Sequence, residues 1–279
     1  MQLLTRNLRP WLQTLAGLSL CLLTLHARAE TATIAVAANF TEVAKQLRQA
    51  FEQQSTHTLK LSFGSTGKIY TQIMHGAPYD VFLSADQQRP QKLLQQDHAV
   101  ADSQFTYAVG KLVLYSRDAK AQVKDGAILR NPTLKRLAMA NPKTAPYGAA
   151  AQTVLNNLSL WPDLKSSIIQ GDSIAQTYQF TFTGNVDAGF VALSQLAGQP
   201  NANYWLIPQD LYYPLNQDAV LLQNGEQNQA AIAFMAFLRS AQAQTLIGSF
   251  GYDTTPPPGT VSPITTAPSN SIKTGHQNR

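Results

Sequence analysis

The amino-acid sequence predicts an α/β protein of two similar lobes, joined by crossover segments, with a ligand cleft between the lobes. Strands and helices alternate along two successive stretches of the chain, which is typical of α/β layers. Several predicted strands are continuous apolar runs, as expected where helices cover both faces of a sheet. Residues 105–115 are extended and long for one strand, so they could carry the chain from the first unit into the second.

The first unit starts with an apolar strand and continues with helices and strands in turn. Within residues 41–54, apolar side chains recur at helical spacing, at Val43, Leu47, Ala50 and Phe51. Strands are predicted over 33–37, 59–63 and 81–85, and helices over 41–54, over 69–74 and in a polar segment through residue 95. This order predicts a parallel sheet with helices on both faces.

The second unit repeats the alternation, and two helices then close the fold. Strands are predicted over 137–140, 167–170, 188–191, 204–207 and 219–222, and helices near 149–157, from Ser173, over 227–239 with a stripe of Ile232, Met235 and Leu238, and over 241–250. The first lobe would comprise residues 30–110 and about 223–252, and the second lobe about 111–222. Such lobes bring carboxyl ends of strands and helix N-termini together at the cleft.

Residues 1–29 have the pattern of a signal peptide. Arg6 and Arg9 form a basic start, residues 11–25 form a short apolar stretch, and Ala27-Arg28-Ala29 matches a cleavage motif. Polar residues interrupt the apolar stretch, which disfavours a permanent membrane span. We therefore expect export, with cleavage after Ala29.

The mature chain is expected to have no thiol and little net charge. Cys21 lies inside the signal segment, and the bulky Leu20 before it disfavours a lipoprotein anchor. The formal net charge falls from +5 to +2 when Arg6, Arg9 and Arg28 leave with that segment. Because the sequence has no basic cluster, nucleic acid is not an expected partner.

Four short segments without Lys or Arg are predicted to open helices. They are Ala37-Ala38-Asn39, Phe63-Gly64-Ser65-Thr66-Gly67, Ala145-Pro146-Tyr147-Gly148 and Gly171-Asp172-Ser173-Ile174. The first turn of a helix has unpaired N–H groups and the positive end of the helix dipole, so several such turns that meet can bind an anion without a formal charge. These segments predict a site for a small tetrahedral oxyanion.

Each segment also has a purely structural interpretation. Asn39 and Ser173 are residues typical of helix caps, and Pro146-Tyr147-Gly148 is a common turn. Two strand-to-helix turns of this kind in one lobe favour a ligand site at both. The pattern leaves open whether Ser65 or Thr66 faces a ligand with its hydroxyl.

No constellation of catalytic or metal-binding residues is evident. Asp80 and Asp86 stand at opposite ends of the predicted strand 81–85, too far apart to share a metal ion, and Asp86 is expected to cap the next helix. The sequence contains no HExxH motif, no phosphate loop and no Ser/His/Asp order. We therefore expect no enzymatic activity, no catalytic residue and no cofactor.

Longer motifs connect these segments to a known family. They are Ala37-Ala38-Asn39-Phe40, Gly64-Ser65-Thr66-Gly67, Gln72-Ile73 with Gly76-Ala77-Pro78, the run from Asp80 to Asp86, Asn141-Pro142, Ala145-Pro146-Tyr147-Gly148, and the run from Gly184 to Ser194. With these motifs, the chain from about Ala32 to Tyr252 resembles the periplasmic molybdate-binding proteins of ABC transporters, which have the type 2 periplasmic binding fold. The runs 80–86 and 184–194 resemble packing signatures more than ligand contacts.

The resemblance implies a function and a set of contacts. It implies a monomeric periplasmic protein that binds molybdate and tungstate and delivers the anion to the membrane permease of an ABC transporter. Carried over by position, the oxyanion contacts fall on Ala38, Asn39, Thr66, Tyr147 and Ile174, and Ser65 is retained beside Thr66. Any metal would be bound only as the molybdate oxyanion.

The chain departs from the family pattern at two places. Many members have Ser where this chain has Asn39, and they supply a tyrosine hydroxyl where this chain has Ala192-Leu193-Ser194. The number of hydrogen bonds to the ligand is therefore expected to differ, while the class of ligand is not.

Other functions remain open from sequence. A binder of sulfate or another tetrahedral oxyanion with the same fold is the nearest alternative. A secreted hydrolase or transferase would need an activated nucleophile, for which the sequence gives no support. A sensor domain of the same fold would predict an appended signalling module, and the C-terminal segment does not resemble one.

Residues 253–279 are rich in Pro, Ser, Thr and Asn, and their composition predicts a disordered tail. We expect removal of residues 256–279 to leave the melting temperature and ligand affinity unchanged, because this segment has no apolar face to bury. Differential scanning calorimetry and ligand titration of the truncated protein test this. A large fall in melting temperature would contradict it.

Overall fold

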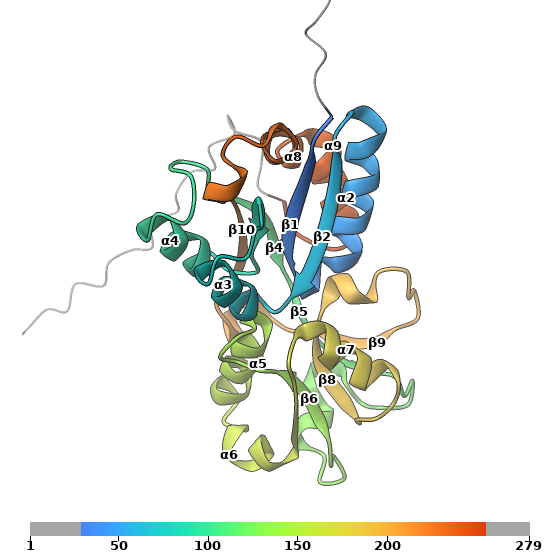
Figure 1. The fold of residues 1–279 in the computed structure, drawn as a ribbon. Helices are drawn as coiled ribbons and strands as arrows, with labels where there is room; N and C mark the ends of the chain where they lie inside the picture. Colours follow the sequence, from blue (N-terminus) through green and yellow to red (C-terminus); the bar gives the residue numbers. More distant parts are fainter. Residues whose placement is uncertain (1–28, 255–279) are drawn as a thin grey trace, which may run out of the picture.

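The computed structural model describes residues 29–254, which form two α/β lobes stacked end to end (Figure 1). Each lobe contains a five-stranded sheet, with the strand orders β2-β1-β3-β10-β4 and β7-β6-β8-β5-β9. The expected two-lobed α/β fold is confirmed. The signal segment up to Arg28, with Cys21, and the tail from Thr255 onward lie outside the described residues.

The first sheet is mixed, whereas the sequence predicted a parallel sheet. β1 (Thr31–Ala37) pairs in parallel with β2 (Thr58–Gly64) and with β3 (Val81–Leu83). β10 (Leu215–Leu221) lies antiparallel between β3 and β4 (Phe105–Gly110). The direction of β10 is reversed because the chain enters it on its return from the second lobe.

Helices cover both faces of the first sheet, as predicted. On one face lie α2 (Thr41–Gln54), α8 (Gln229–Leu238) and α9 (Ala241–Ser249), and on the other lie α3 (Thr66–Met74) and α4 (Gln88–Gln95). Successive residues of β1 point to opposite faces, so Ile34 and Val36 pack with α2 and α8 while Ala35 packs with α3 and α4. This alternation buries the strand on both faces from Ile34 to Ala37.

The second sheet is built in the same way and is also mixed. β6 (Leu137–Ala140) pairs in parallel with β7 (Ile168–Gly171) and β8 (Ala188–Ala192), and β5 (Leu112–Ser116) lies antiparallel between β8 and β9 (Asn203–Leu206). α5 (Pro146–Asn157) packs on one face, α7 (Ile174–Phe182) packs on the other, and the short α6 (Trp161–Leu164) follows α5. Short 3-10 helices occupy Ala38–Phe40 (η1), Lys124–Arg130 (η2), Lys165–Ser167 (η3), Leu193–Leu196 (η4), Gln209–Leu211 (η5) and Gln223–Gly225 (η6).

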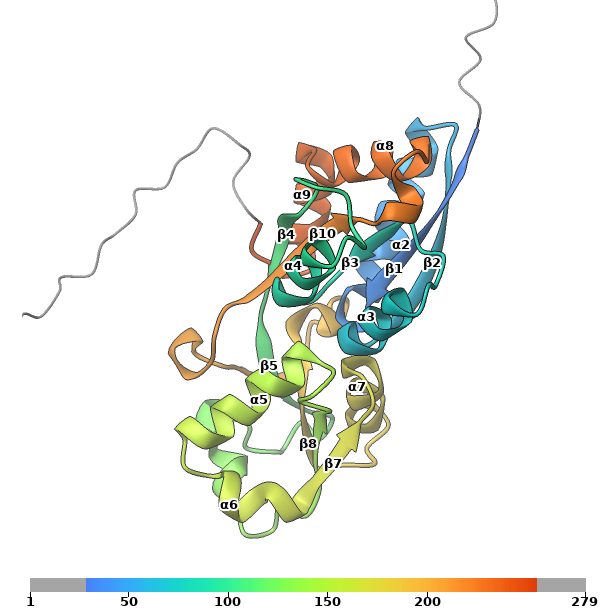
Figure 2. The ribbon, with the colours of Figure 1, turned by 60° about the vertical axis from the view of Figure 1, so that its left-hand side comes forward.

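The chain passes twice between the lobes. β4 continues through Lys111 into β5, and Figure 2 shows the two strands running from the upper lobe into the lower one. The extended stretch 105–115 therefore connects the units, as predicted. The return passage runs through residues 207–214, between β9 and β10. The second lobe thus ends before Leu215, earlier than the predicted boundary at about 222.

β10 begins at Leu215, earlier than the predicted strand 219–222. Its first half was not predicted because it contains polar residues. Gln217 and Asp218 interrupt the apolar pattern, yet both side chains are buried. Asp218 accepts hydrogen bonds from Thr106 Oγ1 and Gln104 Nε2, both at 2.6 Å, which satisfies the buried carboxylate. Such long-range partners are not visible in the pattern of one strand.

The apolar face of α8 also differs from the predicted stripe. Ile232 is 40% exposed, while Ala230, Ala231 and Phe234 are buried with Met235 and Leu238. Within residues 29–254, no single helix has the length and apolar character needed to cross a membrane, and α8 with α9 passes that test only as a pair bent by 65°.

The chain remains part of the first lobe beyond α9. Asp253 forms an antiparallel bridge with Val109, through N–H···O bonds of 2.8 and 3.0 Å, and its carboxylate lies 2.7 Å from Lys111 Nζ. Asp253 was predicted as the first residue of the tail, but it pairs with β4 beside the crossover.

Candidate functional site

The two lobes enclose a small cavity at the place where four helical segments begin. η1 and α3 start there from the first lobe, and α5 and α7 start there from the second. The cavity has a volume of about 10 Å³ and is lined by Ala38, Asn39, Ser65, Thr66, Ala85, Ala145, Pro146, Tyr147 and Ile174. All six residues singled out from the sequence therefore line one cavity.

The lining carries no ionised side chain. Positive potential comes instead from the helix N-termini, whose first N–H groups have no acceptor within the helix. Because each lobe supplies about half of the lining, the cavity forms only when the lobes lie against each other. An uncharged cavity of N–H and O–H donors has the chemistry of a small-anion site.

Ser65 lies at the N-cap position of α3 but does not cap the helix. Its backbone is extended, with φ −69° and ψ 143°, and its side chain accepts no hydrogen bond from the first turn. The hydroxyl is buried and has no hydrogen-bond partner within the described residues. An unpaired buried hydroxyl costs about 1–3 kcal/mol, so an acceptor in the cavity would relieve a real penalty.

Thr66 differs from Ser65 in having a structural bond. Its Oγ1 accepts a hydrogen bond of 3.3 Å from the N–H of Ala85, which follows β3. A hydroxyl that accepts one bond keeps its own proton for donation. Both hydroxyls of the pair can thus donate to a ligand in the cavity.

Asn39 uses its side chain within the protein interior. Its amide nitrogen donates to Gln217 Oε1 at 2.8 Å and to Tyr252 Oη at 2.9 Å. Both amide protons therefore have acceptors, and the donor that Asn39 can offer to a ligand is its backbone N–H. The residue lies within η1, and its side chain makes no cap bond, so the capping interpretation is wrong here.

The side chain of Tyr147 also bonds within the protein, and its hydroxyl is not directed at a ligand. Its hydroxyl accepts a 3.1 Å bond from Gln217 Nε2, and burial raises the pKa of this hydroxyl well above its ordinary value. A Cβ atom placed on Gly110 would lie 2.0 Å from Tyr147 Oη, so only glycine fits at this point of the crossover. Pro146 takes the first helical position, which needs no N–H, and Tyr147 supplies the next N–H.

Ile174 opens α7 behind a true cap. Ser173 Oγ accepts a bond from the Gln176 N–H at 3.3 Å, as the capping interpretation predicted. Gln195 Nε2 donates to the carbonyl of Ile174 at 3.1 Å and thereby holds that backbone in place. Ile174 is buried and apolar, so a ligand could contact only its backbone N–H.

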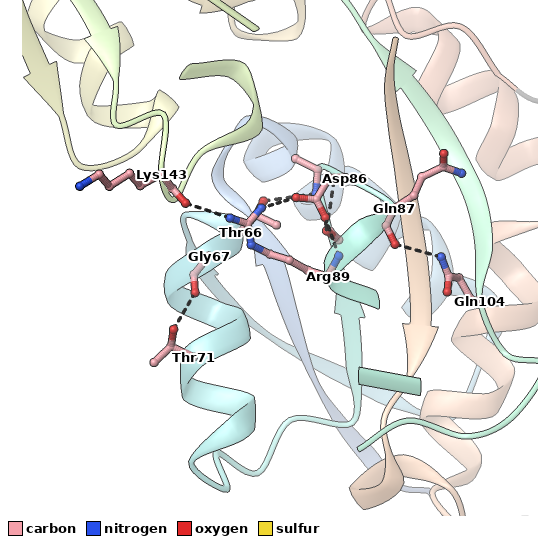
Figure 3. A network of polar contacts seen from close by, with 10 residues as sticks. Thr66, Gly67, Thr71, Asp86, Gln87, Arg89, Gln104 and Lys143 are labelled. Carbon is pink, nitrogen blue, oxygen red and sulfur yellow. Dashed lines mark hydrogen bonds and ion pairs between the residues drawn. The ribbon is translucent and has the colours of Figure 1, made fainter. Parts of the chain in front are cut away.

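Direct bonds join the lobes beside the cavity (Figure 3). The Gly67 N–H donates to the Thr144 carbonyl at 2.8 Å, and Arg89 Nη2 donates to the Lys143 carbonyl at 3.0 Å. Figure 3 shows Arg89 between Asp86 and Lys143, close to Thr66 and Gly67. Asp86 holds the Arg89 guanidinium through an ion pair and, as predicted, also accepts the backbone N–H of residue 89 in α4.

The remaining predicted polar residues have structural roles. Asp80 Oδ2 accepts the Thr33 N–H at 2.6 Å, and Asp80 Oδ1 accepts from Asn224 Nδ2 at 2.8 Å. In the part of the chain from 29 to 254, no three His, Cys, Asp or Glu side chains gather in a way that could hold a metal ion.

The sequence analysis missed the polar residues directly behind the cavity. Gln217 bonds to Asn39 and to Tyr147, and Ser194 Oγ donates to the Asn39 carbonyl at 3.1 Å. The run 184–194 resembles a packing signature in sequence, but its last residue, Ser194, contacts a cavity residue. The signal for these residues was weak, because each is one polar residue in an apolar segment.

Comparison with known proteins gives a consistent family. Residues 32–253 match the model of the family described as bacterial extracellular solute-binding protein. The chain is 47% identical over 232 residues to the molybdate-binding protein ModA of Rhodobacter capsulatus, covering 83% of this chain and 92% of that protein.

Solved structures show the same architecture. The periplasmic molybdate-binding protein of Azotobacter vinelandii matches with a TM-score of 0.76 and 36% identity, over 81% of this chain and all of that one. The sulfate-binding protein SubI of Mycobacterium tuberculosis H37Rv matches with a TM-score of 0.67 at 15% identity, over 82% of this chain and 88% of that one. At that identity the second match shows the fold alone.

Proposed function

Because this chain belongs to the family of bacterial extracellular solute-binding proteins, we propose that it binds molybdate in the cavity between its lobes and delivers it to the permease of an ABC transporter. Its likeness to molybdate-binding proteins over most of the chain supports this assignment. The proposal includes tungstate as a ligand, a periplasmic location after cleavage of the signal segment, a monomeric state and no catalytic step.

The observation that carries the proposal is the unpaired Ser65 hydroxyl in a cavity lined by uncharged donors. The Thr66 hydroxyl and the backbone N–H groups of Ala38, Asn39, Tyr147 and Ile174 would complete the set of donors. Molybdate is a dianion at neutral pH and can accept hydrogen bonds at all four oxygens. No protein acceptor is required in such a site.

The size and protonation of the anion would determine selectivity. Donors held at fixed positions by two lobes would bind most tightly a tetrahedral anion large enough to bond to all of them. Around a smaller anion some donors would stay unpaired. Phosphate retains a proton near neutral pH and is better served by a carboxylate acceptor, and no carboxylate lines the cavity. Sulfate remains the alternative ligand, because it is also a fully ionised tetrahedral oxyanion.

Binding and release would follow from hinge motion at the two crossovers. An anion that enters an open cleft would contact donors of one lobe first and then draw the second lobe onto its other oxygens. The bonds from Gly67 to Thr144 and from Arg89 to Lys143 would form on closure. Release would need only separation of the lobes, since no formal charge pair holds the anion.

Molybdate and tungstate should bind at least about tenfold more tightly than sulfate, a difference of roughly 1.4 kcal/mol. The reason is the penalty for donors left unpaired around the smaller anion. Isothermal titration calorimetry with molybdate, tungstate, sulfate and phosphate tests this. Equal affinities for sulfate and molybdate would favour the alternative ligand.

Ser65→Ala should weaken molybdate binding about 10- to 150-fold, the range for losing a hydrogen bond worth roughly 1.5–3 kcal/mol to a charged partner. Thr66→Ala should weaken binding similarly and also lower apo stability, since the Ala85 N–H loses its acceptor. Asn39→Ala should have a smaller effect through the ligand, because the backbone N–H remains.

Ser240→Ala is the matched control for these variants. Ser240 caps α9 by accepting the Ala243 N–H at 3.2 Å, away from the cavity. Its loss should reduce apo stability by about 1 kcal/mol without changing affinity. If Ser65→Ala instead melts early and binds molybdate normally, Ser65 has only a structural role.

Gly67→Ala should disfavour the closed state. A Cβ atom on Gly67 would lie 2.9 Å from Thr144 Cα and 3.1 Å from the Thr144 carbonyl oxygen, across the lobe interface. In the open state the substitution should be neutral or stabilising, since alanine favours a helix over glycine by about 1 kcal/mol. We therefore expect an unchanged or higher apo melting temperature together with weaker molybdate binding.

Gly248→Ala serves as the control for this substitution. Gly248 lies in α9, and a Cβ atom there would meet only Thr254 Cγ2, at 3.9 Å. It should raise apo stability without changing affinity. Unchanged affinity in Gly67→Ala as well would show that this contact does not limit closure.

A further inference from the structure

The segment after α9 brings one tyrosine into contact with the candidate site. Tyr252 is buried, and its hydroxyl accepts from Asn39 Nδ2 at 2.9 Å and donates to the Asn39 carbonyl at 3.1 Å. The ring of Tyr252 packs edge-to-face against Phe40 at a centroid distance of 5.3 Å. Tyr252 therefore holds both the side chain and the backbone of a cavity residue that it follows by more than 200 positions in the chain.

The same hydroxyl reaches the other lobe. Tyr252 Oη lies 2.9 Å from Ser194 Oγ, in η4 of the second lobe, and either hydroxyl can donate in this bond. Ser194 Oγ also donates to the Asn39 carbonyl at 3.1 Å. One carbonyl of the first lobe and one hydroxyl from each lobe thus lie within hydrogen-bond distance of one another, and the two hydroxyl protons are shared among these three contacts.

The local backbone shows why Tyr252 can reach this position. Gly251 has φ +85°, a conformation that favours glycine, and a Cβ atom there would lie 2.9 Å from Leu193 Cδ2 of the second lobe. On the other side, Asp253 pairs with Val109 next to the crossover. The segment 251–253 is therefore seated between the crossover strand and the second lobe.

The Tyr252 hydroxyl is protonated at neutral pH, as in any tyrosine, and burial extends this to higher pH. Loss of solvent raises its pKa to about 12, against smaller opposing effects from its hydrogen bonds with Ser194 and Asn39. The hydroxyl can thus donate and accept at the same time throughout the physiological range.

We propose that Tyr252 is a positioning residue of the anion site. It holds Asn39 in place, and through its bond to Ser194 it couples the orientation of Asn39 to closure of the lobes. This rests on the proposed function and adds a residue outside the cavity lining. Asn39 can aim its backbone N–H at the ligand because its amide and carbonyl are held from behind. The bonds to Ser194 join the two lobes, so in this proposal they stabilise the closed, liganded state rather than the encounter.

The test is a double-mutant cycle with Tyr252→Phe, Ser194→Ala and the double variant, in the otherwise intact protein. Molybdate association and dissociation rates are measured by stopped flow, and apo melting by calorimetry. Tyr252→Phe should raise the dissociation rate about tenfold with little change in the association rate. The double variant should show less than the product of the two single effects, because the two hydroxyls act on one carbonyl.

Tyr178→Phe is the control for loss of a tyrosine hydroxyl. Tyr178 accepts a bond from Gln199 within the second lobe, and its hydroxyl does not contact the cavity residues. Its removal should leave both molybdate rates unchanged. A purely structural role for Tyr252 would instead lower the apo melting temperature and leave the dissociation rate as in the wild type, and this would overturn the proposal. Independent, multiplicative effects of the two single substitutions would overturn it as well.

Failure of the proposed function has a different signature. The wild type is first titrated with molybdate, tungstate, sulfate and phosphate, and the cycle is run with the anion that binds most tightly. Tight binding of sulfate in place of molybdate would contradict the proposed ligand, while coupling measured with sulfate would still support the role of Tyr252. A wild type that binds none of the four anions would contradict both.

Discussion

Backbone N–H groups at the start of a helix have no partner within that helix, and here the starts of four helical segments meet at one place. This requirement for acceptors organises the rest of the molecule. It places the cavity at the carboxyl ends of β1 and β2 in one lobe and of β6 and β7 in the other. It also explains why the lining can be uncharged, since the donors and the helix dipoles already supply positive potential.

A layer of satisfied polar groups lies directly behind these unsatisfied donors. Gln217 receives the amide of Asn39 and donates to Tyr147, so one buried side chain connects a cavity residue of each lobe. The single hydroxyl proton of Tyr107 is shared between Gln217 Oε1 and the Ser84 carbonyl, both within the first lobe. Fully bonded buried networks of this kind restrict side-chain orientation. The side chains of this network are used to hold the site in place. The Ser65 hydroxyl, in contrast, has no partner and can bond to a ligand.

Several contacts at the edge of the cleft are exposed ion pairs or single hydrogen bonds, which suits reversible closure. The Lys68–Asp172 ion pair is largely exposed, and such pairs contribute about 0–1 kcal/mol. The bonds to the Lys143 and Thr144 carbonyls are single hydrogen bonds at the edge of the cleft. A ligand shared between the lobes can therefore shift the balance between open and closed forms through its contacts with both lobes.

Local patterns in the sequence predicted most of the elements and the four segments that line the cavity, and the family resemblance selected the contacts within those segments. Apolar periodicity predicted most strands and helices, and the residues that follow strands and open helices included all six lining residues named in advance. These signals are local, because strand alternation, helical spacing and helix starts involve neighbours within a few positions. The family motifs then connected the pattern to an oxyanion.

Only the tertiary structure decided how distant segments meet. The polar first half of β10 becomes a central strand because Asp218 finds Thr106 and Gln104, and its antiparallel direction follows from the return crossover. The orientation of the Asn39 amide depends on Gln217 and Tyr252, both more than 170 positions away. Hydrogen-bond partners at such separations leave no periodic trace along the chain, so the sequence by itself determined which residues open the helices, and the folded structure determined where each side chain points.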